Sequence, residues 1–118
     1  MNRKDLNPEI WGPKAWFFLD SAILSYPDNP TDNIKNSYKT FIISLKDILP
    51  CTNCREHFIK YINTNPLTDK ILSSRIRIQE WILNLHNNIN KFNNKDIITY
   101  KNYINYYNKI YKNYYRIF

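Results

Sequence analysis

The chain has 118 residues, of which 43% are hydrophobic and 16% are aromatic, and its formal net charge is +7. This length suits one domain with a modest core. A single glycine and six prolines leave few residues for the tight turns of β-hairpins, so the composition favours helices joined by short polar loops. The basic charge indicates either a solvated basic surface or an acidic partner, such as nucleic acid or a small polyphosphate.

Neither a membrane span nor a secretory leader is indicated. No apolar run approaches the ~18 residues that cross a bilayer. Residues 1–5 lead into no signal-type apolar segment. Two cysteines without such a signal favour a reactive dithiol over a structural disulfide, because structural disulfides belong to oxidising compartments.

The N-terminal third predicts a frayed segment and then a helix. Residues 1–8 are polar, and we expect them to be frayed. Residues 10–26 have helical periodicity, with one apolar stripe formed by Trp11, Ala15, Leu19, Ala22 and Tyr26. Asp20 falls beside this stripe, on the side of Trp16 and Ile23. We expect its carboxylate at the solvent margin, with a position beside a ligand as the alternative.

Three further helices follow before residue 93. Residues 32–48 predict a second helix, whose apolar positions are Tyr38, Phe41, Ile42, Leu45 and, just beyond it, Leu49. A third begins at the cysteines and ends near Asn63. Thr68 and Asp69 restart the chain. A fourth spans residues 73–92, where Ile78, Ile82, Leu85, Ile89 and Phe92 repeat with the 4-3-4-3 spacing of a bundle seam.

The last segment predicts a tyrosine-rich amphipathic helix over residues 100–114. Its alternating tyrosines and lysines resemble surfaces that stack on single-stranded nucleic acid. An ordinary aromatic packing face is the interpretation that we favour.

The cysteines are the feature most indicative of chemistry. Cys51 and Cys54 form a C-x-x-C motif directly after Pro50, and proline is tolerated at a helix start but not inside one. The pair therefore occupies a first helical turn, where free N–H groups and the helix dipole stabilise a thiolate. Half of a zinc site remains an alternative, although His57 and His86 fit no compact finger spacing. A structural disulfide also remains, although so short a bridge closes almost no loop.

A polar cluster on the fourth helix is the second such feature. Asn is a poor helix former and costly to bury unpaired. His86 and Asn90 nevertheless share one face beside the apolar seam, with Asn87 next to them. These groups could surround an adenine or ribose, or belong to a solvated asparagine-rich run. Asn84 and Asn88 are interpreted as solvated.

Three motifs together resemble one family. Residues 11–19 with Tyr26-Pro27 are similar to a W-G-x-x-x-W-x-x-L-H…Y-P helix, and residues 49–58 to a P-C-x-x-C-x-x-H-F helix. Residues 81–90, followed by Lys95 and Tyr100, are similar to a W…H-N-x-V-N helix. In this order the motifs resemble the Erv/ALR flavin-linked sulfhydryl oxidases, most closely the short single-domain forms of large DNA viruses. The resemblance covers roughly residues 8–110.

The resemblance implies an all-α fold, a four-helix bundle with a short fifth helix that holds FAD non-covalently at one end. Residues 1–118 would form one FAD-binding oxidase domain, usually a homodimer, which could begin a longer chain. Cys51 would exchange with a protein dithiol substrate or a thioredoxin-like shuttle. Cys54 would lie against the flavin, and O₂ would accept the electrons to give hydrogen peroxide.

The same resemblance implies a cofactor site without a metal. The expected FAD contacts are Gly12, Trp16, Asp20, Cys54, His57, Phe58, Trp81, His86, Asn87, Ile89, Asn90, Lys91, Lys95 and Tyr100. Lysines beside a pyrophosphate would account for part of the basic charge, so no nucleic acid and no membrane is expected as partner. If the protein is viral, we expect it in the host cytoplasm or the virion.

Two departures from the family pattern stand out. Asp20 replaces the histidine of the L-H pair, which loses or changes one FAD contact. No second C-x-x-C exists in the sequence, so a shuttle would have to come from elsewhere. The alternatives to an oxidase are a basic helical module that binds RNA or an acidic protein, with an incidental C-x-x-C, and a zinc-stabilised helical domain.

Overall fold

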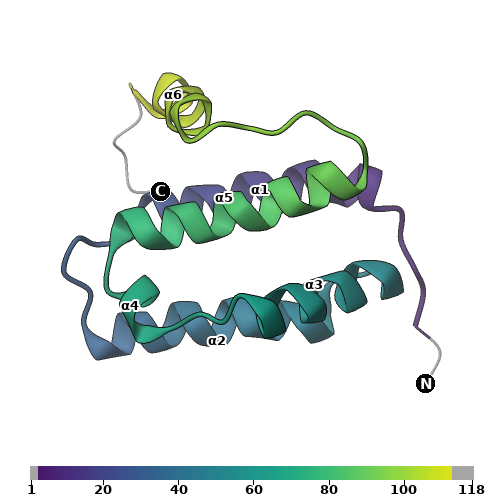
Figure 1. Ribbon diagram of the computed structural model, residues 1–118, viewed down its shortest axis with the longest axis horizontal. Coiled ribbons are helices and arrows are strands. Elements are labelled where there is room, and N and C mark those ends of the chain that lie inside the picture. Colours follow the sequence, from purple (N-terminus) through teal and green to yellow (C-terminus); the bar gives the residue numbers. More distant parts are fainter. Residues whose placement is uncertain (1–2, 113–118) are drawn as a thin grey trace.

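The structure is a computed structural model that describes residues 3–112, and these residues form helices and no strand (Figure 1). The helices are α1 (Pro8–Leu24), α2 (Asp32–Ile48), α3 (Thr52–Thr64), α4 (Asp69–Leu72), α5 (Arg75–Phe92) and α6 (Tyr100–Tyr111). α1 packs on α5 and α2 packs on α3, so the four long helices form a two-layered bundle (Figure 1). The predicted all-α bundle is therefore confirmed.

Local sequence signals set the helix ends. Pro8 occupies the first turn of α1, where its missing N–H costs no hydrogen bond. The side-chain oxygen of the residue before a helix accepts a backbone N–H at Asn7, Thr31, Thr68, Ser74 and Thr99. α2 has the predicted bounds. α5 begins two residues later than predicted because Ser74 is its cap, and Asp69–Leu72 forms a separate short helix.

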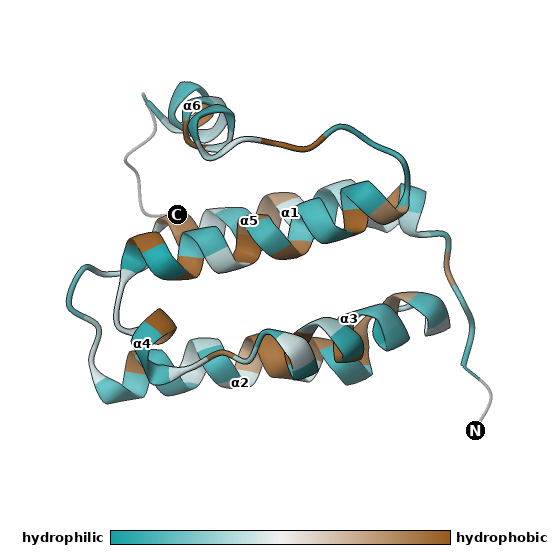
Figure 2. Ribbon diagram, viewed as in Figure 1, coloured by the Kyte–Doolittle hydropathy of each residue, from teal (hydrophilic) through white to brown (hydrophobic). Residues whose placement is uncertain are grey.

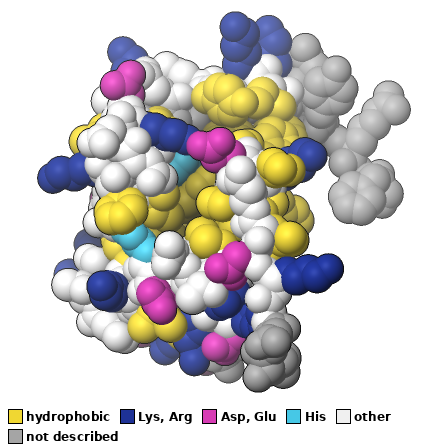
Figure 3. Space-filling view, turned by 90° about the vertical axis from the view of Figure 1, so that its right-hand side faces the viewer, with side chains coloured by type: hydrophobic (Ala, Val, Ile, Leu, Met, Phe, Trp, Pro, Cys, Tyr) yellow, Lys and Arg dark blue, Asp and Glu magenta, His cyan; other side chains and the backbone are white. Residues whose placement is uncertain are grey.

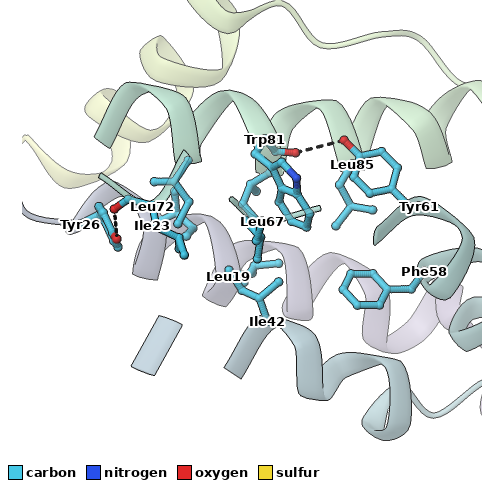
Figure 4. Packing of buried hydrophobic residues seen from close by; sticks show 12 residues of the cluster. Leu19, Ile23, Tyr26, Ile42, Phe58, Tyr61, Leu67, Leu72, Trp81 and Leu85 are labelled. Carbon is cyan, nitrogen blue, oxygen red and sulfur yellow. Dashed lines mark hydrogen bonds between the residues drawn. The ribbon is translucent and has the colours of Figure 1, made fainter. Parts of the chain in front are cut away.

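The main core lies between the two layers of the bundle. Figure 2 shows that hydrophobic positions concentrate where the helices face one another, and Figure 4 shows the packed side chains. The buried members are Leu19, Ile23, Tyr26, Ile42, Phe58, Tyr61, Leu67, Leu72, Ile78, Trp81, Ile82 and Leu85. No helix within residues 3–112 is long and apolar enough to cross a membrane.

A second, smaller core lies outside the bundle. α6 crosses the outer side of the α1–α5 layer and is seen end-on in Figure 1. Its Tyr103 and Tyr107 are buried against Leu83 of α5. The prediction of an aromatic packing face is thus confirmed for the described part of this helix, whereas Tyr114 lies outside the described residues.

Two aromatic side chains predicted in the main core are exposed. Phe41 of α2 is 43% exposed and packs edge-on against the exposed Phe18 of α1. Phe92 is 73% exposed because it is the last residue of α5. Ala15 is also exposed, since burial on α1 centres on Leu19 and Ile23. A helical repeat identifies the apolar face but not where a partner helix stops covering it.

Two other expectations were wrong. Asp20 is 3% exposed rather than at the solvent margin, because α6 covers that side of α1. Residues 3–6 before α1 are tied to the bundle rather than frayed, since the Leu6 N–H donates to the Pro50 carbonyl oxygen at 2.7 Å, whereas residues 1 and 2 lie outside the described residues. Both errors have one cause, namely contacts with segments distant in sequence.

Candidate functional site

One end of the bundle gathers most of the predicted site residues. The start of α1, the C-x-x-C turn before α3 and the end of α5 all lie on the right in Figure 1. Figure 3 looks at this end and shows hydrophobic side chains in its recessed centre with histidine side chains among them. The three motifs that are far apart in sequence therefore meet at one surface.

The two cysteines open α3. Cys51 is the N-cap, and its Sγ accepts the Cys54 backbone N–H at 3.3 Å; both thiols are free. Burial is the main cause that raises the pKa of Cys54 to about 12, and the hydrogen bond and charge of Cys51 add to it. The expected thiolate stabilisation at the helix start is thus outweighed at Cys54 in the dithiol form. Both cysteines are half-buried.

His57 is held by a residue that the sequence did not single out. Its Nε2 lies 2.6 Å from Asn88 Oδ1 on α5, and its ring packs edge-on against Phe92 at 5.2 Å. A groove of about 280 Å³ runs beside this pair between α3 and α5, lined by His57, Lys60, Tyr61, Thr64, Asn65 and Asn88. Asn88 is exposed, in agreement with its interpretation as solvated. Its contact with His57 is visible only when α3 and α5 are seen together.

Trp16 and His86 form an aromatic stack across α1 and α5. Their ring centroids are 3.9 Å apart and the planes are within 6° of parallel. Burial, and then the charge of Lys95, lowers the pKa of His86 to about 4, so the imidazole is neutral at pH 7. The structure thus joins one residue from each of two predicted motifs.

Asn87 fastens the segment after α5. Its Nδ2 donates to the Ile98 carbonyl oxygen at 2.7 Å, and its Oδ1 accepts the Ile98 N–H at 2.8 Å. The amide of Asn90 donates to the same Oδ1 at 3.4 Å, and the Asn90 carbonyl oxygen accepts the Lys95 N–H at 2.7 Å. These contacts hold the loop that carries Lys95 beside the stacked rings. The predicted amide cluster therefore shapes the site's edge.

Asp20 lies on the same side of α1 as Trp16, one turn further on, and faces α6. Its Oδ2 accepts the Tyr107 hydroxyl at 2.7 Å. Burial raises the pKa of Asp20 to about 6, and the hydrogen bond from Tyr107 opposes that rise. Asp20 Oδ1 and the Tyr103 hydroxyl are buried without a hydrogen-bond partner. Sequence reasoning does not single out Tyr103 and Tyr107 as neighbours of Asp20, although their i, i+4 spacing marks them as one helix face.

The other predicted contacts are distributed around this end and through the core. Phe58 and Trp81 are buried in the main core, where the Trp81 Nε1–H donates to the Asn65 carbonyl oxygen at 2.9 Å. Ile89 packs against the same core, Lys91 is exposed, and the Tyr100 hydroxyl donates to Gln79 Oε1 at 2.8 Å. Gly12 is half-buried, and a Cβ there would meet nothing within 4 Å. Contact of these residues with FAD stays a prediction.

Within residues 3–112, no group of three or more His, Cys, Asp or Glu side chains is placed to hold a metal ion. A profile of the Erv1 / Alr family matches residues 13–113. The chain is also 39% identical over 99 residues to an FAD-linked sulfhydryl oxidase of African swine fever virus. The aligned region covers 82% of this chain and 79% of that protein. The chain belongs to the Erv1/Alr family.

Other relatives agree with this assignment. A probable FAD-linked sulfhydryl oxidase of Acanthamoeba polyphaga mimivirus is 40% identical over 95 residues, covering 80% of this chain and 66% of that protein. The crystal structure of the yeast Erv1 core has a TM-score of 0.76 at 29% identity and covers 98% of this chain and 92% of that chain. The FAD binding domain of Erv1 from Saccharomyces cerevisiae has a TM-score of 0.76 at 31% identity, and the match covers 94% of this chain and 99% of that chain. The resemblance to the Erv1/Alr family and the helical fold are confirmed.

Proposed function

We propose that this chain is an FAD-linked sulfhydryl oxidase domain that forms disulfides in protein dithiols through Cys51 and Cys54. The observation that carries the proposal is a C-x-x-C turn at the start of α3 in an Erv1/Alr bundle whose α1 and α5 also form the Trp16–His86 stack. Relatives that match across most of this chain are named for the same activity.

Residues of α1, α5 and α6 fit a bound FAD. Asp20 Oδ1 and the Tyr103 hydroxyl are buried polar atoms that lack a partner within the protein, which is costly unless a further group supplies one. Asp20 lies one helical turn after Trp16 on α1, and the flat rings of the Trp16–His86 stack, with the imidazole neutral, suit an adenine or flavin. Open space beside Gly12 leaves room for close approach to the α1 backbone.

The proposed cofactor contacts follow from these positions. Trp16, His57, His86 and Asn90 would contact the rings and ribose, while Lys91 and Lys95 offer positive charge to the pyrophosphate. When bound, FAD accepts an electron pair and passes it to O₂, which gives hydrogen peroxide.

Thiol–disulfide exchange is the part that the chain's own residues perform. In the oxidised pair, a substrate thiolate attacks Cys51 Sγ, a new disulfide joins substrate and Cys51, and Cys54 leaves as a thiolate. The second substrate thiolate then attacks the substrate sulfur of that mixed disulfide and releases Cys51. The substrate loses two electrons and two protons, and the pair gains the electrons. The position of Cys51 supports it as the sulfur that meets substrate, because Cys51 is the N-cap that precedes α3 whereas Cys54 lies within the helix.

The partners of this domain are proposals of the same kind. A protein dithiol or a thioredoxin-like shuttle would supply the electrons. The exposed rings of Phe18 and Phe41, 6.4 Å apart on neighbouring helices, support a homodimer that covers them. The viral relatives support a location of this domain in the host cytoplasm or the virion.

Oxygen uptake with dithiothreitol tests the proposal. Cys54→Ser should abolish uptake and retain bound FAD, because the serine hydroxyl cannot form the disulfide. Asn53→Ala changes an exposed neighbour in the same turn and should keep the wild-type rate. A Cys54→Ser protein that consumes oxygen as fast as the wild type would overturn the mechanism.

A further inference from the structure

The segment before α1 is fastened to the turn that carries the cysteines. Asp5 Oδ1 accepts the Thr52 backbone N–H at 3.0 Å and the Thr52 hydroxyl at 2.9 Å. Beside it, Leu6 donates its N–H to the Pro50 carbonyl oxygen, and the Arg3 guanidinium donates to the Asp47 carbonyl oxygen at 2.8 Å. Residues 3–6 therefore form a strap across the entrance to α3, and Asp5 is its acidic anchor.

Asp5 supplies a cap that the cysteine alone provides poorly. The first N–H groups of a helix have no partner inside it, and the Thr52 N–H is one of them. The other cap in this turn is Cys51 Sγ, and sulfur is a weak acceptor. A carboxylate that accepts two hydrogen bonds from Thr52 is a stronger fastening than that sulfur.

The carboxylate also places a negative charge where it acts on Cys54, and through Thr52 it is bonded to the residue that follows Cys51. Among the causes that raise the pKa of Cys54, the charge of Asp5 is the smallest, after burial and the contacts with Cys51. Arg55 lies on the same turn with the opposite charge, bonded to Thr52 Oγ1 at 3.1 Å, and Arg3 lies on the strap. Asp5 is thus the acidic group that the strap brings to the turn with the two cysteines.

We propose, resting on the oxidase function above, that Asp5 is a positioning and specificity residue: it fastens the first turn of α3 and disfavours negatively charged thiols as partners of Cys51. The attacking sulfur is a thiolate, and Cys54 leaves with a negative charge. Any further negative charge on the thiol compound adds to the repulsion by Asp5. The effect on rate is modest, because the carboxylate is exposed and salt screens it.

Three small thiols of different charge measure this preference directly. The Cys51–Cys54 disulfide is reduced by cysteamine, 2-mercaptoethanol or glutathione, which carry positive, zero and negative charge apart from the thiol. The reaction is quenched by alkylation and followed by mass spectrometry, so it needs neither flavin nor oxygen. The rates are compared between wild type and Asp5→Asn, since the amide oxygen of asparagine keeps an acceptor for Thr52 while the charge is lost.

Asp5→Asn should accelerate reduction in the order glutathione, then 2-mercaptoethanol, then cysteamine. We expect a gain of about threefold for glutathione, little change for cysteamine, and loss of the difference at ~0.5 M salt. Asp28 lies on the loop between α1 and α2, and Asp28→Asn changes the net charge by the same amount. This control variant should not accelerate reduction in the order of thiol charge. Arg3 and Arg55 are identical in all these proteins.

Two outcomes separate this inference from the function on which it rests. Equal acceleration of all three thiols, or none, would overturn the role of Asp5 while leaving the oxidase intact. Failure of Cys51 and Cys54 to form a disulfide at all would overturn the oxidase itself. Asp5→Ala, which removes charge and acceptor together, should show the same order of thiols and in addition a strap more susceptible to proteolysis.

Discussion

Substitution of Asp20 by asparagine should stabilise the domain at neutral pH. Burial raises the pKa of Asp20 from 3.8 to about 6, so the folded protein holds a proton that the unfolded chain releases. A folded-state pKa above the unfolded value contributes stability that is complete below about pH 4. That stability is lost as pH rises through about 6.

The size of the effect follows from the shift. A rise of about two pKa units lowers the free energy of unfolding by about 3 kcal/mol at pH 7.5. Roughly half of this lost stability is regained when the pH falls to 5. Asp20 is 3% exposed, so solvent screens it little. The asparagine side chain would be neutral at all these pH values and could still accept the Tyr107 hydroxyl.

Urea unfolding of the FAD-free protein measures this difference. The free energy of unfolding of Asp20→Asn should exceed that of the wild type by about 3 kcal/mol at pH 7.5 and approach it near pH 4. Comparison of the two proteins at each pH cancels the contributions of the other titrating groups to the free energy of unfolding. A difference that is the same at pH 4 and pH 7.5 would refute the reasoning, as would a variant less stable than the wild type at neutral pH.

Two further changes test the site and the surface. Asn87→Ala should lower the free energy of unfolding by about 2 kcal/mol, because it leaves the Ile98 N–H and carbonyl unpaired. Asn84 is exposed on the same helix, so Asn84→Ala should change that free energy very little. Equal losses for the two variants in urea titrations would contradict this prediction. Phe41→Glu should turn a dimer into a monomer in sedimentation, because it charges the exposed pair with Phe18. A wild-type protein that already sediments as a monomer would rule out that interface.

Local signals in the sequence determined the helices well. Residues 32–48 were predicted as a helix and α2 has these bounds, because Thr31 caps it and Pro50 lies just beyond it. The Cys51 turn was placed correctly at the start of α3 for the same kind of reason. Caps, prolines and apolar repeats act over a few residues, so a single segment is enough to reveal them.

Contacts between distant segments were not predictable in this way. Asp20 was expected near solvent because the periodicity of α1 says nothing about α6, whose Tyr107 lies 87 residues later. Asp5 was expected to be frayed, although it bonds Thr52 across 47 residues. Asn88 is exposed, as its interpretation as solvated requires, and its contact with His57 of α3 is an addition that the sequence does not show. The errors at Asp20 and Asp5 each concern a polar group whose partner is remote in sequence.

The visible absorbance spectrum of the purified protein tests the central claim most directly. A yellow protein with about one flavin per chain, whose visible band bleaches when dithiothreitol is added without oxygen and returns with air, is the predicted result. In Cys54→Ser the band should be present but should not bleach at the wild-type rate. A colourless protein that stays colourless after incubation with FAD would contradict the assignment of this chain as an FAD-linked sulfhydryl oxidase.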